Sequence, residues 1–206
     1  MPPRRPTADL PGQALPVELM NTIRADRRGV HDRLATLEDA RRWVELIGSR
    51  AELSGLDGAV ELGRDALPGL RNLRDAVRRI AAEHTHDPRE RAVSPTPDLA
   101  TAVAVVNDSV RGAQLWPALQ LTEGGIVERR DASGPPDALL IGVLAAEAIR
   151  LFGQGDDLEL RACLAPNCAL YFIKDHPRRE WCSPACGNRA RAVRHYARHG
   201  KGPGAR

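Results

Sequence analysis

The residues best suited to chemistry are four cysteines near the end of the chain: Cys163, Cys168, Cys182 and Cys186. They form two short pairs, C-x4-C and C-x3-C, with thirteen residues between the pairs. Two such pairs, brought together by a turn, supply the tetrahedral set of ligands that zinc prefers. Because four thiolates leave no open coordination position, we expect one structural zinc ion with no catalytic role.

The residues around each pair favour this arrangement. Ala165-Pro166-Asn167 lies inside the first pair and is a turn-forming sequence. Ser183-Pro184 follows Cys182 and is typical of a helix start, with serine as the N-cap and proline in the first helical position. Cys186 would then lie in the first helical turn, where the positive end of the helix dipole favours a thiolate.

Other arrangements of the cysteines fit less well. Two disulfides need an oxidising compartment, and residues 1–13 contain no apolar export signal, so we expect a cytoplasmic protein with free thiols. Four unrelated buried thiols are the other alternative, but all four fall within twenty-four residues. A Cys2His2 finger ending in His195 and His199 needs about twelve residues between its second cysteine and first histidine. Twenty-six residues separate Cys168 from His195.

Positive charge is concentrated in the same segment. From Arg161 onward, ten Lys and Arg residues accompany two acidic residues, a net charge of +8, whereas the first 160 residues carry a net charge of −5. A compact basic unit joined to a mildly acidic body is typical of a polyanion-binding module. We therefore expect duplex DNA as a partner.

A helix running from the Ser183 cap to about His199 would carry two opposite stripes. Arg191, Arg194 and Arg198 form a basic stripe that suits phosphate contacts, and a solvated face without a partner is the alternative. The opposite stripe contains the small apolar residues Ala190, Val193 and Ala197, which we expect to pack on the zinc core. The complete set of candidate DNA-binding residues is Lys174, Arg178, Arg179, Asn188, Arg189, Arg191, Arg194 and Arg198.

Two of these candidates have structural alternatives. Asn188 could hydrogen-bond a neighbouring carbonyl instead of a base edge, and Arg189 could lie against Trp181 instead of reaching a phosphate. We expect Trp181 to pack in the module's core, and Gly187 to let the backbone pass close to the metal.

The run from Arg179 to Arg189, Arg-Glu-Trp-Cys-Ser-Pro-Ala-Cys-Gly-Asn-Arg, resembles the signature of the CGNR zinc-finger family. The stretch Leu15-Pro-Val-Glu-Leu-Met-Asn-Thr22 is similar to the opening of the ABATE domain that precedes that finger. The resemblance implies a bacterial transcription regulator with a DNA-binding zinc module.

The domain organisation follows from these patterns. We expect a disordered lead-in at 1–13, a helical ABATE-like domain at 14–155, a CGNR zinc finger at 156–200 and a disordered tail at 201–206. The body should be mainly α with one β-hairpin, and its apolar stripes should close on each other and not on the finger. The finger should be a small treble-clef or ribbon-like zinc module ending in a helix.

Five helices are predicted in the body. The first begins near Pro16 and includes Ile23, the second is capped by Thr36-x-x-Asp39, and the third begins at Pro68 with its arginines on the solvent side. The fourth is capped at Thr96-Pro97, and the last opens at Pro136. The expected apolar faces are Ala40, Trp43, Val44 and Ile47; Leu70, Leu73, Val77 and Ile80; Leu99, Val103, Val106 and Val110; and Leu140, Leu144, Ala148 and Leu151.

Between the last two helices, Leu119–Thr122 and Ile126–Arg129 flank Glu123-Gly124-Gly125, which predicts a hairpin with a Gly-Gly turn.

The body offers few candidates for a second site. Asn21, Thr22 and Arg24, on the first predicted helix, could line a pocket for a small-molecule effector, or simply make helix–helix hydrogen bonds. His31-Asp32 and His84-x-His86-Asp87 are the clustered candidates for acid–base or metal chemistry. We see no nucleophile motif, phosphate loop or zinc-protease motif, and therefore expect no enzyme.

Three readings of the function remain. The first is a DNA-binding regulator whose body senses a ligand or mediates a homodimer. An RNA-binding or protein-interaction module with a structural zinc is one alternative, and an enzyme with its site in the body is another. No run of eighteen apolar residues is present, so no membrane partner is expected.

Overall fold

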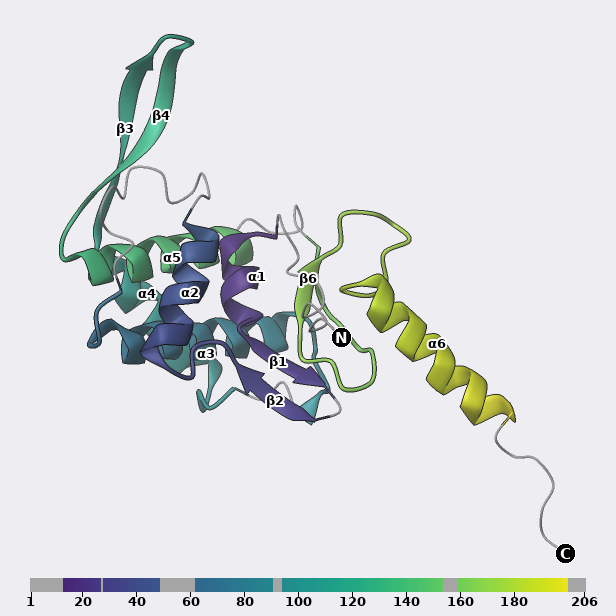
Figure 1. The fold of residues 1–206 in the computed structure, drawn as a ribbon. Coiled ribbons are helices and arrows are strands. Elements are labelled where there is room, and N and C mark those ends of the chain that lie inside the picture. Colours follow the sequence, from purple (N-terminus) through teal and green to yellow (C-terminus); the bar gives the residue numbers. More distant parts are fainter. Residues whose placement is uncertain (1–12, 27, 49–61, 91–93, 154–158, 200–206) are drawn as a thin grey trace, which may run out of the picture.

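The computed structural model describes residues 13–26, 28–48, 62–90, 94–153 and 159–199. The helices are α1 (Leu15–Met20), α2 (Leu37–Ile47), α3 (Ala66–His84), α4 (Leu99–Arg111), α5 (Pro136–Gly153) and α6 (Pro184–His199). Three antiparallel strand pairs are β1 (Ile23–Asp26) with β2 (Gly29–Asp32), β3 (Gln114–Thr122) with β4 (Gly125–Ser133), and β5 (Leu160–Ala162) with β6 (Tyr171–Ile173). The predicted class, a mainly helical body followed by a small cysteine module that ends in a helix, is confirmed (Figure 1).

The body helices pack around one apolar core. α3 contacts α1, α4 and α5, and α5 also contacts α1 and α4. The predicted cap of α2 is confirmed, because Thr36 Oγ1 accepts a hydrogen bond from the Asp39 amide at 3.1 Å. The apolar face predicted behind that cap is buried as expected: Ala40, Trp43, Val44 and Ile47.

The first predicted helix is too long. α1 ends at Met20, and the chain then forms the β1–β2 hairpin, so the body has two hairpins instead of one. Ile23 and Arg24 therefore lie on a strand. Asn21 is the C-cap of this helix, and its side chain bonds the backbone of distant Tyr171, with Asn21 Nδ2 donating to the carbonyl and Oδ1 accepting from the amide, both at 2.9 Å.

α3 begins two residues before the predicted start at Pro68, and its predicted apolar face is largely buried. Two of its arginines depart from the expected solvent-facing position. Arg74 is 4% exposed and bonds Asp32 at 2.6 Å. Arg78 is 2% exposed and donates to the carbonyl of Met20 at 2.8 Å. Arg78 supplies a donor to a carbonyl at the end of α1, and Arg74 bonds the same Asp32 oxygen that accepts from the Leu34 amide.

α4 starts after Asp98 instead of at Thr96-Pro97. The Asp98 carboxylate accepts a hydrogen bond from the Thr101 amide at 2.7 Å, which is the capping contact. The buried face is also rotated from the expected one. Ala102 and Val106 are buried, whereas the predicted face residues Leu99 and Val103 are 37% and 43% exposed.

The predicted β3–β4 hairpin is confirmed and is longer than expected. Thr122 pairs with Gly125, so the turn consists of Glu123 and Gly124, and Gly125 belongs to β4 with a φ of +115°. The hairpin extends away from the helices, on the opposite side of the molecule from α6 (Figure 1).

The body core does not close on itself as the sequence suggested. Leu160 on β5 and Tyr171 on β6 belong to the same buried cluster as the body helices, and Ile173 packs against it. The zinc module therefore shares the core of the body. Among the described helices, none combines the length and apolar character needed to cross a membrane.

Candidate metal centre

The β5–β6 hairpin and the start of α6 bring the four cysteines together. Cys163 and Cys168 lie in the loop between β5 and β6, and Cys182 and Cys186 lie just before and inside the first turn of α6. All four are buried. The predicted turn inside the first pair is confirmed: the Cys168 amide donates to the Ala165 carbonyl at 3.0 Å. Asn167 adopts a left-handed φ of +58°, which asparagine tolerates well.

The second pair depends on the predicted helix start. α6 begins at Pro184, and Ser183 Oγ accepts a hydrogen bond from the Cys186 amide at 3.3 Å. This capping contact fixes the first turn, so the Cys186 sulfur is held beside the backbone amides of the helix N-terminus.

The separations between the sulfurs fit a tetrahedral zinc ion. All four sulfurs lie within 4.8 Å of one another, with 3.8 Å between Cys168 and Cys182 and 3.4 Å between Cys182 and Cys186. Ligands at 2.3 Å from a tetrahedral zinc stand about 3.8 Å apart. A disulfide would require about 2.05 Å between two sulfurs. The donor set and its spacing therefore form a zinc site.

Hydrogen bonds among the four thiols favour the ionisation of two of them and oppose it in the other two. Hydrogen bonds within the cluster, chiefly from Cys168, lower the pKa of Cys163 to about 7. The pKa of Cys186 is lowered as well, first by its hydrogen bond with Cys163. Since zinc binds thiolates and not thiols, the lowered pKa values of Cys163 and Cys186 favour metal binding, whereas hydrogen bonds to Cys163 raise the pKa values of Cys168 and Cys182.

The Cys-Gly-Asn-Arg run supports the centre directly. Arg189 donates to the Cys186 sulfur at 3.0 Å, which offsets the negative charge of a metal-bound thiolate. Gly187 has a different role from the one expected, because an added Cβ would lie 3.1 Å from Cδ1 of Trp181. The glycine makes room for that ring, and Trp181 packs against the cysteine cluster as predicted.

The proposed DNA-binding residues separate into two groups. Arg191, Arg194 and Arg198 are exposed on one face of α6, and the exposed Asn188 accepts a hydrogen bond from Arg191. Arg178 is exposed in the loop before α6. The others are held by the module itself: Lys174 contacts Glu159 at 3.4 Å, Arg179 bonds Asp175 at 2.7 Å, and Arg189 contacts Cys186.

The apolar stripe of α6 does not pack as expected. Ala190 is buried, but Val193 is 50% exposed and Ala197 is exposed too. The zinc module is too small to cover more than the first two turns, so every residue from 191 to 199 is exposed. α6 therefore projects from the module with most of its residues exposed (Figure 1).

An arginine clamp, formed by Arg89 with Asp87, joins the body to the zinc module and was not predicted. Arg89 Nη1 donates to the carbonyls of Cys163, Cys168 and Leu170 at 3.0–3.2 Å. Its other nitrogens bond the Asp87 carboxylate at 2.6 and 2.7 Å, which also accepts from the Tyr171 hydroxyl at 2.7 Å. The only hint was the neighbouring His84-x-His86-Asp87 cluster, whose acid is used in this contact.

Within the clamp, the charges of Asp87 and Arg89 compensate each other. Burial opposes the ionisation of Asp87, but hydrogen bonds from Arg89 and Tyr171 outweigh it and lower the pKa of this carboxyl. Burial, with the Asp87 hydrogen bond, raises the pKa of Tyr171 to about 12. Both groups therefore keep the protonation states that their hydrogen bonds require at neutral pH.

The candidate effector residues have separate locations. Asn21 and Thr22 are buried, and their side chains are engaged by the Tyr171 backbone and by the Leu19 carbonyl. Arg24 instead lines a cleft of about 670 Å³ between the β1–β2 hairpin and the zinc module, together with Arg33 and Arg189.

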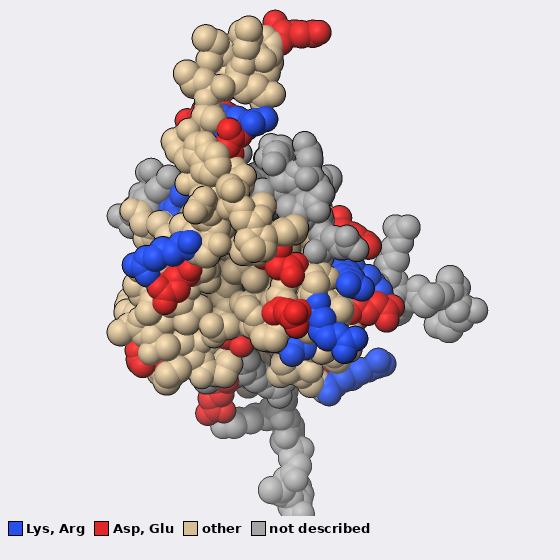
Figure 2. All heavy atoms as spheres, turned by 90° about the vertical axis from the view of Figure 1, so that its left-hand side faces the viewer, with Lys and Arg blue, Asp and Glu red and all other residues tan. Residues whose placement is uncertain are grey.

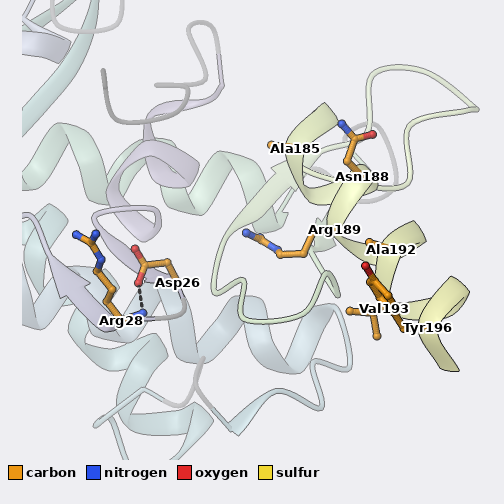
Figure 3. A pocket seen from close by; sticks show the side chains of 8 residues that line it. All are labelled: Asp26, Arg28, Ala185, Asn188, Arg189, Ala192, Val193 and Tyr196. Carbon is orange, nitrogen blue, oxygen red and sulfur yellow. Dashed lines mark hydrogen bonds between the residues drawn. The ribbon is translucent and has the colours of Figure 1, made fainter. Parts of the chain in front are cut away.

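A second groove, of about 540 Å³, continues along α6 and shares Asp26, Ala185 and Arg189 with the cleft. Figure 3 shows Asp26 and Arg28 on the body side, opposite the α6 side chains. The wall on α6 is partly apolar, formed by Ala192, Val193 and Tyr196. Hence four arginines and one carboxylate surround a space that both parts of the chain enclose.

Comparison with known families assigns both parts of the chain. Residues 13–155 match the model of the ABATE family, described as "Putative stress-induced transcription regulator". Residues 159–199 match the model of the CGNR zinc finger. A search of curated proteins found no match. The chain belongs to the ABATE family and carries a CGNR zinc finger after its ABATE domain.

Proposed function

We propose that this protein is a DNA-binding transcription regulator, acting in the cytoplasm by binding and not by catalysis. The observation that carries this proposal is α6. Its residues 191–199 are all exposed, the helix contains no acidic residue, and Arg191, Arg194 and Arg198 share one face. The major groove of B-DNA admits a helix, and arginines along one face can contact its phosphates. The zinc centre fixes the base of this helix.

The experiment compares duplex DNA binding by two charge-matched variants, using fluorescence anisotropy on genomic fragments at about 0.1 M salt. Arg191, Arg194 and Arg198 are replaced by Ala in the first. The control replaces Arg42, Arg64 and Arg150, which are exposed on the body and lie outside the other surfaces discussed. We expect a loss of about tenfold or more in the first variant and little change in the control. An equal loss in both would show that only overall charge matters and would contradict docking by α6.

The same proposal gives the body a sensing role at the cleft between β1–β2 and the zinc module. A small anion with an apolar part fits the arginines of the cleft and the apolar α6 wall of the adjoining groove. Binding there would contact the body and the base of α6 together, so it could alter how α6 meets DNA.

Isothermal titration with inorganic phosphate and with benzoate tests this role on the zinc-loaded chain. Binding of either that is lost in an Arg24→Ala, Arg33→Ala double variant supports the site. The absence of any heat of binding, or an equal heat of binding in the wild-type and double-variant proteins, would contradict the proposed site.

A further inference from the structure

The β3–β4 hairpin exposes an unusual amount of apolar surface. Leu119, Leu121 and Ile126 are 70–80% exposed. The pairing of Leu121 with Ile126 places all three on one face, because alternate residues of a strand share a face. Trp116 and Val127, each 44% exposed, lie on the other face. A two-stranded hairpin is marginally stable by itself in water, so this arm needs a partner surface.

A second apolar surface lies on the outward side of α4. Leu99, Ala100, Val103 and Ala104 line one shallow groove there. Charged residues enter it only at the C-terminal end, where Asp108 and Arg111 pair with each other. In the space-filling view, charged side chains appear at the tip of the hairpin and part of the way down it, and uncharged surface lies between them and continues onto the body below (Figure 2).

The hairpin cannot cover this groove in its own chain. β3 begins at Gln114, directly after α4, and the base of the hairpin is held by Leu115 and Ala132 packing on the core. From that base it extends away from the helices (Figure 1). Its apolar end must therefore meet another molecule.

We propose that the partner is a second copy of this chain, with the hairpin end of each copy docked on α4 of the other. The argument is self-complementarity. In a two-fold dimer, the hairpin end of each copy covers the α4 groove of the other copy. The two equivalent contacts then bury both apolar surfaces in both copies. Nine residues of β3 extend about 30 Å, and thirteen residues of α4 extend about 20 Å, so the arm is long enough to follow the helix. A different protein docked on the hairpin would leave the α4 groove uncovered.

This dimer would present two DNA-docking helices. The hairpin and α6 leave the body on opposite sides, so the contact leaves α6 exposed in both copies (Figure 1). Two such helices suit paired half-sites on DNA. The dimer does not depend on DNA binding and can fail or hold independently of it.

The test measures the mass of the full zinc-loaded chain in solution by light scattering and sedimentation. We expect a dimer at micromolar concentration. Replacing Leu121 by Glu and Ile126 by Lys keeps a favourable cross-strand pair within the hairpin but removes the apolar surface. This variant, and separately Val103→Asp on α4, should raise the dimer Kd roughly a hundredfold. Leu46→Glu is the matched control, because Leu46 is 60% exposed on α2 and should be irrelevant.

A cross-linking experiment examines the geometry. Mixing a Val103→Cys chain with a Leu121→Cys chain should give a disulfide between the two chains, which neither protein forms alone. A monomeric wild type would overturn the proposal. So would a dimer unaffected by both surface variants, or tip-to-tip cross-linking of Leu121→Cys alone. The hairpin and α4 variants, once monomeric, should still bind single DNA half-sites through α6. Loss of the dimer can therefore be distinguished from a failure of the proposed DNA binding.

Discussion

At the scale of residues, the metal ligands could be predicted from the sequence and their supporting contacts could not. Four cysteines at local spacings, with a turn in one pair and a helix cap in the other, already predicted the cluster. Whether Arg189 serves DNA or the metal depends on side-chain direction, which no spacing fixes. The structure places Arg189 3.0 Å from the Cys186 sulfur. We therefore assign it to the zinc centre.

Replacing Arg189 by Ala should consequently weaken zinc binding. Loss of a contact that supports a ligand typically lowers metal affinity about 10–100-fold. Competition with a chromophoric chelator measures the affinity, and Arg178→Ala serves as a control because Arg178 is exposed in the preceding loop. An Arg189→Ala protein with unchanged zinc affinity but weakened DNA binding would reverse the assignment.

At the scale of elements, strongly periodic helices were predictable and short or rotated ones were not. α2 and α3 carry apolar residues at helical spacing over several turns, and these faces are buried. β1 and β2 have four residues each, too few for an alternating pattern to stand out. The buried face of α4 is set by its packing against α3 and α5, so Leu99 and Val103 were misplaced. Arg78 bonds the carbonyls of Met20 and Ala169, which lie 58 and 91 residues away in the sequence.

The arginine clamp between elements gives a prediction of its own. Arg89→Met should destabilise the folded chain by about 3–5 kcal/mol, because it leaves the buried Asp87 carboxylate without its cation. Asp87 is 1% exposed and Arg89 is 11% exposed, so solvent does not replace the contact. Chemical unfolding measures the change, and Arg42→Met on the surface of α2 is the control, because Arg42 is 63% exposed. A loss as small as that of the control would show that the clamp contributes little.

At the scale of the whole molecule, the ABATE body and the zinc module form one structure. Leu160 and Tyr171 of the module lie in the body core, and Arg89 of the body bonds three carbonyls of the cysteine loop. The sequence suggested separate units because their composition and charge differ so strongly. Contacts between segments that are distant in the sequence cannot be recognised from the composition or the charge of either segment. α6 therefore extends from a base that both parts of the chain build.

The central claim is that this helix docks on DNA through its basic face. The slope of log affinity against log salt concentration tests it most directly, because each phosphate contact contributes about −0.9 on duplex DNA. Fluorescence anisotropy over a salt series should give a slope shallower by about 2.7 for each docked α6 when Arg191, Arg194 and Arg198 are all replaced by Ala, with zinc content unchanged. Identical slopes for the wild-type and variant proteins would contradict the claim.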